Sequence, residues 1–85
     1  MEKVKRIATA LIQIDKKQAS VDRVNKVLSV YASAILSRQG LSLPKRDYSL
    51  ISLILEADAN YINSLAGKIG IIAGAQIKVS MIKEN

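Results

Sequence analysis

Residues 63–80, NSLAGKIGIIAGAQIKVS, contain three of the four glycines in the chain together with Lys68. A phosphate-binding loop has the pattern G-x-x-x-x-G-K-[ST] and joins a strand to the helix that follows it. Here Ile69 follows Lys68, and no glycine lies five positions before Gly67. The segment also runs from a helical pattern into a strand pattern, which is the reverse of the order that phosphate binding requires. The sequence therefore predicts a structural turn rather than a nucleotide site.

The three glycines of this segment are expected to have structural roles. Gly70 comes just after the helical pattern, where a glycine in the left-handed conformation commonly ends a helix. Gly74 precedes the last strand and is expected to form the tight turn into it. Gly67 falls in the last helical turn, where the missing Cβ would let a neighbouring backbone approach closely.

The segments on either side of this turn have the periods of a helix and a strand. Residues 58–70 carry apolar side chains at helical spacing, with Asp58 as the expected N-cap. The apolar face of this helix consists of Ile62, Leu65, Ala66 and Ile69. Residues 75–82 alternate as a strand does, with inward positions at Ile77, Val79 and Met81.

Residues 48–57, YSLISLILEA, show the clearest strand pattern of the chain. One face is apolar throughout and consists of Ile51, Leu53, Leu55 and Ala57. Leu50 and Ile54 belong to the opposite face, and a strand that is apolar on both sides needs cover on both sides. We therefore expect these two residues, with Leu11 from the first strand, to lie at a contact between subunits.

The first half of the chain completes the pattern. Residues 6–14 predict a strand with core positions at Ala8, Ala10, Ile12 and Ile14. An amphipathic helix is expected from an N-cap at Ser20 to about Ala32, with Val21, Val24, Leu28 and Tyr31 inward. A strand over 35–43 and a turn over 44–47 follow. The order βαββαβ is typical of the α+β ferredoxin-like fold, a four-stranded antiparallel sheet with two helices on one face. We expect residues 1–85 to form one such domain.

Composition limits the chemistry that this chain can perform. It has 85 residues, of which 49% are hydrophobic, and it contains neither cysteine nor histidine. A chain this short buries only about 60–65% of its unfolded surface, so self-association is an expected source of further burial. The absence of thiols and imidazoles excludes disulfides, zinc and iron–sulfur sites and the nucleophilic triads. The seven carboxylates are scattered, so we expect no metal, no cofactor and no catalytic residue.

The charge balance favours an anionic partner only weakly. The formal net charge is +6, which is typical of proteins that meet nucleic acid or other anions. The basic residues are dispersed, however, so a solvated surface explains them better than a binding patch does. The longest charge-free run, residues 27–37, has 11 residues, well short of the roughly 20 that span a bilayer. We therefore expect a cytoplasmic protein with no membrane partner.

Several segments resemble one known family. Residues 65–80 contain LAGKIG and GAQIKVS, which resemble the C-terminal signature of the iron-only hydrogenase system regulators. Residues 24–40, VNKVLSVYASAILSRQG, resemble the first helix and second strand of that family, with Arg38 and Gly40 at its R-x-G element. Residues 49–55, SLISLIL, resemble its third strand. The resemblance extends over most of the chain.

This resemblance implies an ACT-like fold, similar to the C-terminal domain of the nickel-responsive transcription regulator. It also implies a homo-oligomer, dimer or tetramer, with a role in transcription or metabolic regulation. Small ligands of ACT-like proteins bind at subunit interfaces, so Arg38 with Gly40 is our candidate contact for an anionic ligand. The alternative for Arg38 is an ordinary strand residue or a dimer contact. Without histidine or cysteine, the nickel chemistry of the related domain cannot be carried over.

Two other functions fit the same order of elements. The RNA-recognition motif stacks bases on aromatic residues of its first and third strands, but here only Tyr48 lies near such a position, and the chain has no ribbon-helix-helix or helix-turn-helix segment. Acylphosphatase is an enzyme of this order, but residues 15–18, DKKQ, contain neither glycine nor arginine. Asp15 and Asp22 are the remaining acid–base candidates, and a strand end and a solvated helix face explain them better. The sequence thus favours a non-enzymatic module, with direct nucleic-acid binding through the basic surface as the alternative.

Overall fold

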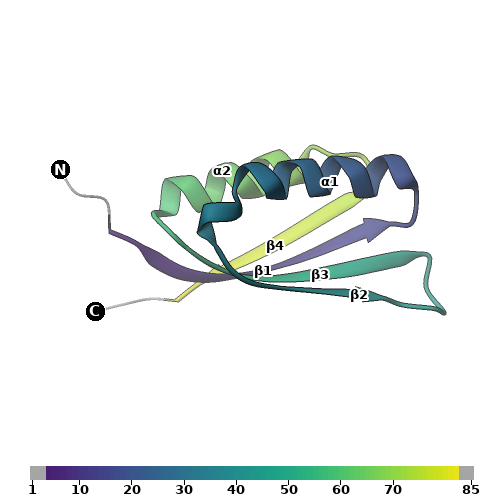
Figure 1. Ribbon diagram of the computed structural model, residues 1–85, viewed down its shortest axis with the longest axis horizontal. Helices are drawn as coiled ribbons and strands as arrows, with labels where there is room; N and C mark the ends of the chain where they lie inside the picture. Colours follow the sequence, from purple (N-terminus) through teal and green to yellow (C-terminus); the bar gives the residue numbers. More distant parts are fainter. Residues whose placement is uncertain (1–3, 83–85) are drawn as a thin grey trace.

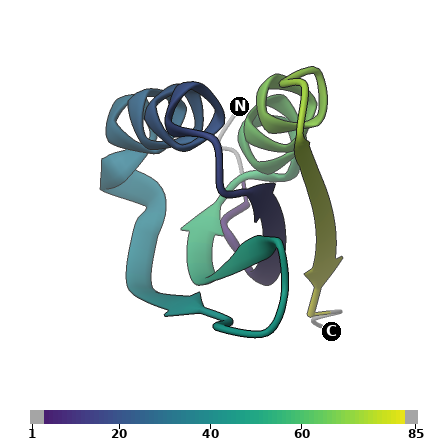
Figure 2. The ribbon, with the colours of Figure 1, turned by 90° about the vertical axis from the view of Figure 1, so that its right-hand side faces the viewer.

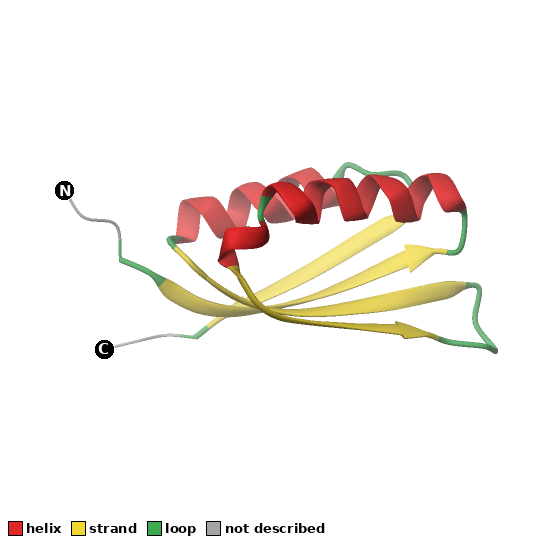
Figure 3. Cartoon of the chain, in the orientation of Figure 1, coloured by secondary structure: helices red, strands yellow, loops and turns green. Residues whose placement is uncertain are grey.

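The computed structural model describes residues 4–82 and contains four strands, two α-helices and one short 3-10 turn (Figure 1). In chain order these are β1 (Arg6–Asp15), α1 (Gln18–Val30), the 3-10 turn (Ala32–Ala34), β2 (Ile35–Ser42), β3 (Tyr48–Ala57), α2 (Ala59–Gly70) and β4 (Ala75–Met81). The strands form one antiparallel sheet of order β2-β3-β1-β4. Both helices lie on the same face of this sheet (Figures 2 and 3). The predicted βαββαβ fold is confirmed.

The register of the two central strands places their apolar residues on the helix side. Ala8 lies opposite Leu55, Ala10 opposite Leu53 and Ile12 opposite Ile51. Because successive strand residues point to opposite faces, each pair puts two apolar side chains on one side of the sheet. All six of these residues are buried. The alternation predicted for β1 and β3 is confirmed.

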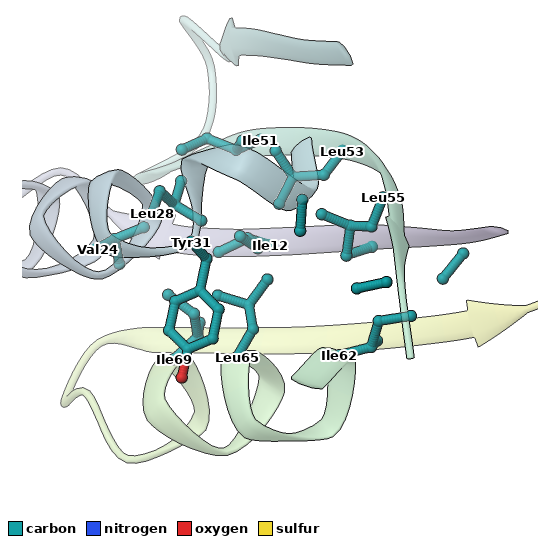
Figure 4. Packing of buried hydrophobic residues seen from close by; sticks show 14 of the residues in the cluster. Ile12, Val24, Leu28, Tyr31, Ile51, Leu53, Leu55, Ile62, Leu65 and Ile69 are labelled. Atoms are coloured by element: carbon teal, nitrogen blue, oxygen red, sulfur yellow. The ribbon is translucent and has the colours of Figure 1, made fainter. Parts of the chain in front are cut away.

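The helices close the core from above. Buried side chains of α1 and α2 meet the sheet in a single cluster (Figure 4) that includes Val24, Leu28, Ile62, Leu65 and Ile69. Tyr31, directly after α1, is also buried and shares a hydrogen bond of 2.7 Å with Ser64 Oγ of α2. The helical faces predicted from spacing thus point inward, although Val21 and Ala66 are only half-buried.

The N-terminus of α2 matches its prediction. Asp58 is the N-cap, and its carboxylate accepts the backbone N–H of Tyr61 at 3.0 Å. This bond satisfies one of the N–H groups that have no partner inside the helix.

The prediction that Ser20 caps α1 is wrong. The helix begins at Gln18 after Lys17, whose backbone N–H donates to Asp15 Oδ1 at 3.0 Å. This aspartate-centred turn sets the direction of the chain before the helix starts. Ser20 therefore lies in the first helical turn, where it is buried and donates to the Ala73 carbonyl at 3.3 Å. The helix also ends earlier than expected, at Val30, and the 3-10 turn continues the chain.

The expectations for Gly70 and Gly67 are also wrong. Gly70 is the last residue of α2, the next residue Ile71 has a φ of −88°, and Gly74 is the sole residue with positive φ in the described range 4–82. Tight turns end the helix instead, with the N–H of Ile72 donating to the Ile69 carbonyl at 3.0 Å. A Cβ on Gly67 would meet nothing within 4 Å, so no backbone approaches there.

Candidate ligand-binding and assembly surfaces

One face of the sheet carries no helix (Figure 2). We call it the open face. The register assigns to it Ile7, Thr9, Leu11 and Gln13 of β1, Leu50, Ser52, Ile54 and Glu56 of β3, and Gln39 and Leu41 of β2. Its composition is mixed, but its apolar members are large side chains.

Four apolar residues gather at the middle of the open face. Leu11 lies opposite Ser52, so Leu50 and Ile54 are its diagonal neighbours on β3. Leu41 lies opposite Leu50 and extends the group onto β2. Leu41, Leu11 and Ile54 are 52%, 49% and 41% exposed, and Leu50 is half-buried. The structure thus brings together the three residues expected at a subunit contact.

Leu41 was missed in the sequence because β2 lacks a clean alternation. A register shift between Ile35 and Ser37 changes which residues of β2 point to each face. Only the pairing with Leu50 shows that Leu41 belongs to the open face. On the β4 side, two shallow hollows of about 250 and 500 Å³ adjoin Leu11 and share Lys78. The apolar group of the open face is therefore bordered by polar residues on both sides, Gln39 of β2 and Lys78 of β4.

Arg38 and Gly40 lie on β2, an edge strand of the sheet. They are opposite Leu53 and Ile51, so both point to the helix side. The Arg38 guanidinium reaches α1, where an NH2 nitrogen donates to Asn25 Oδ1 at 2.6 Å. A Cβ on Gly40 would meet nothing within 4 Å, which leaves space beside the arginine. A guanidinium has five N–H donors, so this exposed edge can also accommodate a carboxylate or phosphate.

Asp15 and Gly74 join the two helix–strand connections at one end of the sheet. The N–H of Asp15 donates to the Gly74 carbonyl at 2.9 Å. Gly74 has a φ of 86°, and a Cβ there would overlap the Asp15 carboxylate and approach Ser20 Oγ to 2.9 Å. Only glycine fits this turn without displacing its neighbours.

The environment of Asp15 favours its ionised form. The neighbouring Ser20 hydroxyl, which can turn from the Ala73 carbonyl to Asp15, and the hydrogen bond from the backbone N–H of Lys17 lower the pKa of the Asp15 carboxyl, and the Lys17 charge adds to the effect. A carboxylate with a lowered pKa is a poor proton donor or acceptor near neutral pH. Asp22, the other acid–base candidate, accepts the Gln18 amide at 2.8 Å on an exposed helix surface. Both carboxylates therefore have structural roles.

The described residues show neither a metal cluster nor a membrane-spanning helix. Between residues 4 and 82, no three side chains of the types that ligate metals lie together. In the same range, neither helix has the length and apolar character needed to cross a bilayer. Near the start of α2, a hollow of about 320 Å³ is lined by Lys5, Glu56, Asp58 and Tyr61 among others. Because the Asp58 carboxylate already caps the helix, this hollow offers no built acid–base pair.

Solved structures define the class of this fold. The chain is similar to the ACT domain of the GTP pyrophosphokinase of Chlorobium tepidum, with a TM-score of 0.70 at 15% identity over 95% of this chain and 90% of that chain. It is also similar to a formyltetrahydrofolate deformylase from Pseudomonas putida, with a TM-score of 0.60 at 11% identity over 87% of this chain and 28% of that chain. At such identities the likeness shows the fold alone. The molecule has an ACT-like fold.

The family can be stated more narrowly. Residues 6–79 match the family "TM1266-like: Iron-only hydrogenase system regulator, putative", and the chain belongs to this family. The uncharacterized protein TM1266 from Thermotoga maritima is similar over 94% of this chain and 100% of that chain, with a TM-score of 0.92 at 29% identity. A search among curated proteins finds no match. The family resemblance of the sequence is confirmed.

Proposed function

We propose that this chain is a non-enzymatic regulatory module that works as a homo-oligomer and binds a small anionic ligand at a subunit boundary. The observation that carries the proposal is the apolar group on the open face, Leu11, Leu41, Leu50 and Ile54. Both helices of the described residues lie on the other face of the sheet (Figure 2). The regulator family to which the chain belongs supports the regulatory part.

The size of the apolar group indicates how strong the assembly would be. Full burial of a leucine or isoleucine contributes about 1.5–3 kcal/mol, so a side chain that is already half-buried contributes about 1 kcal/mol. Four such residues on each of two subunits contribute about 8 kcal/mol, which is within the range of about 4–15 kcal/mol that association costs. Burial of these residues therefore roughly offsets the cost of association, and the open face by itself supports at most a weak oligomer. Pairing at the exposed edge strands would strengthen it.

Two features support a role other than nucleic-acid binding. Tyr31 is buried and packs against the half-buried Tyr61 in the helix layer, with ring centroids 4.8 Å apart, so neither ring lies on the sheet surface where bases stack. The open face has an aromatic residue only at its end, where Tyr48 is half-buried opposite Asp15. A base-stacking sheet needs two or more exposed aromatic residues.

The oligomer is tested by native mass spectrometry on the wild type and on the double variant Leu50→Lys/Ile54→Lys. We expect a dimer or tetramer for the wild type and a monomer for the variant, because lysine charges on a contacting face repel each other. The control is Ile71→Lys, which adds a charge at an exposed residue after α2 and should leave the number of subunits unchanged. A monomeric wild type, or a double variant with the same number of subunits as the wild type, would contradict the proposal.

The ligand part is tested by thermal unfolding with inorganic phosphate or succinate. Binding at 100 times Kd stabilises a protein by about 2.7 kcal/mol. We expect one of the two probes to raise the Tm of the wild type but not that of Arg38→Ala. Arg38→Lys should retain only part of the rise in Tm, because lysine cannot form the bidentate hydrogen bonds of a guanidinium group. If neither probe raises Tm, or if Arg38→Ala responds as the wild type does, Arg38 has no anion-binding role.

A further inference from the structure

The outer surface of the helix layer contains a groove between α1 and the end of α2. A hollow of about 410 Å³ is lined by Arg23, Lys26, Val27, Lys68, Ile71 and Ile72. A second hollow of about 230 Å³ is lined by Lys26, Val27, Val30, Tyr31 and Lys68. Because the two hollows share three residues, they form one continuous depression, which we call the helix groove.

The helix groove combines two kinds of side chain. Arg23, Lys26, Val27 and Val30 follow one another at i, i+3, i+4 and i+7 and so form one stripe along α1. Across the groove, Lys68 lies in the last turn of α2, and Ile71 and Ile72 follow the helix. The lining therefore holds three cations and several aliphatic residues but no carboxylate.

The aliphatic residues of the groove are not explained by the core of the domain. Ile71 is 86% exposed and Val30 is 69% exposed. Val27 and Ile72 are half-buried and pack against the core, so they form the floor between the exposed residues. Aliphatic side chains that are this exposed, arranged around a recess and bordered by cations, are typical of a protein–protein contact.

The charge of the groove determines which partner fits. A second copy of the same surface would bring three cations against three cations, which repel. The carboxylates of the described residues do not offer a complementary strip either: Asp15, Asp22 and Asp47 lie on separate segments, and Glu56 and Asp58 share a hollow with Lys5 while Asp58 caps α2. The described residues thus supply no complementary surface, and an acidic segment of another protein fits the charge of the groove.

The apolar floor distinguishes a peptide from the other anions. Phosphate groups of a nucleic acid pair with cations but gain nothing from aliphatic residues, and Tyr31 in the groove is buried and cannot stack on a base. A flat lipid surface would contact the protruding Val30 and Ile71 but would leave the recess at Val27 and Ile72 unfilled. An amphipathic helix can place its apolar face on this floor and its carboxylates beside the cations.

We propose that the helix groove is a docking surface for an acidic amphipathic helix of another protein. Leucine-like side chains of the partner helix contact Val27, Ile71 and Ile72, while its flanking glutamates or aspartates pair with Arg23, Lys26 and Lys68. The groove lies on the opposite layer from the open face, so self-assembly through the sheet and docking on the helices do not compete.

The binding test uses a panel of fluorescein-labelled acidic peptides that carry leucine at i, i+3, i+4 and i+7 with flanking glutamates. Fluorescence anisotropy should show saturable binding to the wild type that weakens as salt increases. A scrambled peptide of the same composition is the first control, because it keeps the charge but loses the apolar stripe. Absence of saturable binding by every striped peptide, or equal binding of the scrambled peptide, would overturn the proposal.

Variants locate the binding site. Lys26→Glu/Lys68→Glu should weaken binding about 10-fold, because two pairs of up to about 1 kcal/mol each are lost and replaced by repulsion. The matched control Lys5→Glu/Lys45→Glu changes the net charge equally at exposed positions outside the groove and should bind as the wild type does. Ile71→Ser should weaken binding about 10-fold or more, and Leu36→Ser, at another exposed residue, should not.

Other outcomes of these measurements would overturn the docking proposal or separate it from the proposal on oligomers. Equal weakening by the control pair Lys5→Glu/Lys45→Glu would show that only net charge matters and would overturn the proposal. Selective, groove-dependent binding of phosphatidylserine vesicles or of single-stranded DNA, in place of the peptides, would assign the groove to a membrane or a nucleic acid instead. The double variant Leu50→Lys/Ile54→Lys should still bind the peptides, which separates this proposal from the one on oligomers. Circular dichroism on every variant checks that the helices remain folded.

Discussion

Replacement of Gly74 by alanine tests the account of the turn that joins α2 to β4. The backbone of Gly74 has a φ of 86°, and an added Cβ would overlap the Asp15 carboxylate. The identical change at Gly67 is the matched control, since a Cβ there meets nothing within 4 Å and the residue lies inside α2. We expect the two substitutions to change stability in opposite directions.

The expected magnitudes follow from the local geometry. An L-residue in the left-handed region costs about 1–2 kcal/mol, and relief of an overlap in a packed region costs about 1–3 kcal/mol more. Gly74→Ala should therefore destabilise the domain by about 3 kcal/mol, which lowers Tm by about 12–24 °C for a chain of this size. Gly67→Ala should stabilise it by about 0.5–1 kcal/mol, because alanine is the better helix former.

Urea unfolding followed by circular dichroism measures both effects at one protein concentration. A single concentration is needed because the stability of an oligomer depends on it. The midpoints should shift while the slopes of the transitions stay equal. Our reasoning is refuted if Gly74→Ala is as stable as the wild type, or if Gly67→Ala is destabilised to a similar extent. The first result would mean that the turn relaxes freely, and the second that glycine itself, not its position, matters.

Three further predictions address the caps, the core and the pH dependence of stability. Asp58→Ala removes the N-cap of α2 and should lower the free energy of unfolding by about 1 kcal/mol in urea, while Asp58→Asn should restore most of the loss. Leu28→Ala, at a buried residue of α1, should lower the free energy of unfolding by about 2–5 kcal/mol in the same assay. A loss below about 1 kcal/mol would contradict the packing described. The pKa of Asp15 lies below its ordinary value of 3.8 in the folded chain because of the neighbouring Ser20 hydroxyl and the hydrogen bond from the Lys17 backbone N–H. The contribution of the ionised carboxylate to the free energy of unfolding is therefore complete above that value and is lost as the pH falls through the lower, folded pKa. Urea titrations across acidic pH should show a stability difference between the wild type and Asp15→Asn that shrinks with acidification, and a difference that does not change with pH would refute this account.

Local patterns in the sequence were sufficient for most of the fold. Alternation identified the core face of β1 and β3, and helical spacing identified Val24, Leu28, Ile62 and Leu65 as buried. Asp58 was recognisable as a cap because a cap bonds to a residue only three positions later. Each of these signals depends on neighbours within one turn or two strand residues.

The candidate sites were less visible. Leu11, Leu50 and Ile54 could be selected by their positions on strands, but Leu41 joined them only through the pairing of β2 with β3. Asn25 as the partner of Arg38 had no local signal, because the two residues are 13 positions apart and meet across the sheet edge. The helix groove was invisible for the same reason, since Lys26 of α1 and Lys68 of α2 come together only when the helices pack.

The sequence by itself determined the order of elements, the inward faces of strands and helices, and the absence of thiol and imidazole chemistry. These properties depend on residue type and short-range spacing. Tertiary structure decided the rest: the helix start at Gln18 in place of a cap at Ser20, the sole positive φ of the described residues at Gly74, and the grouping of apolar and basic residues into two opposite surfaces. Those features arise from contacts between segments that are distant in the chain, and strand register and helix packing create these contacts only on folding.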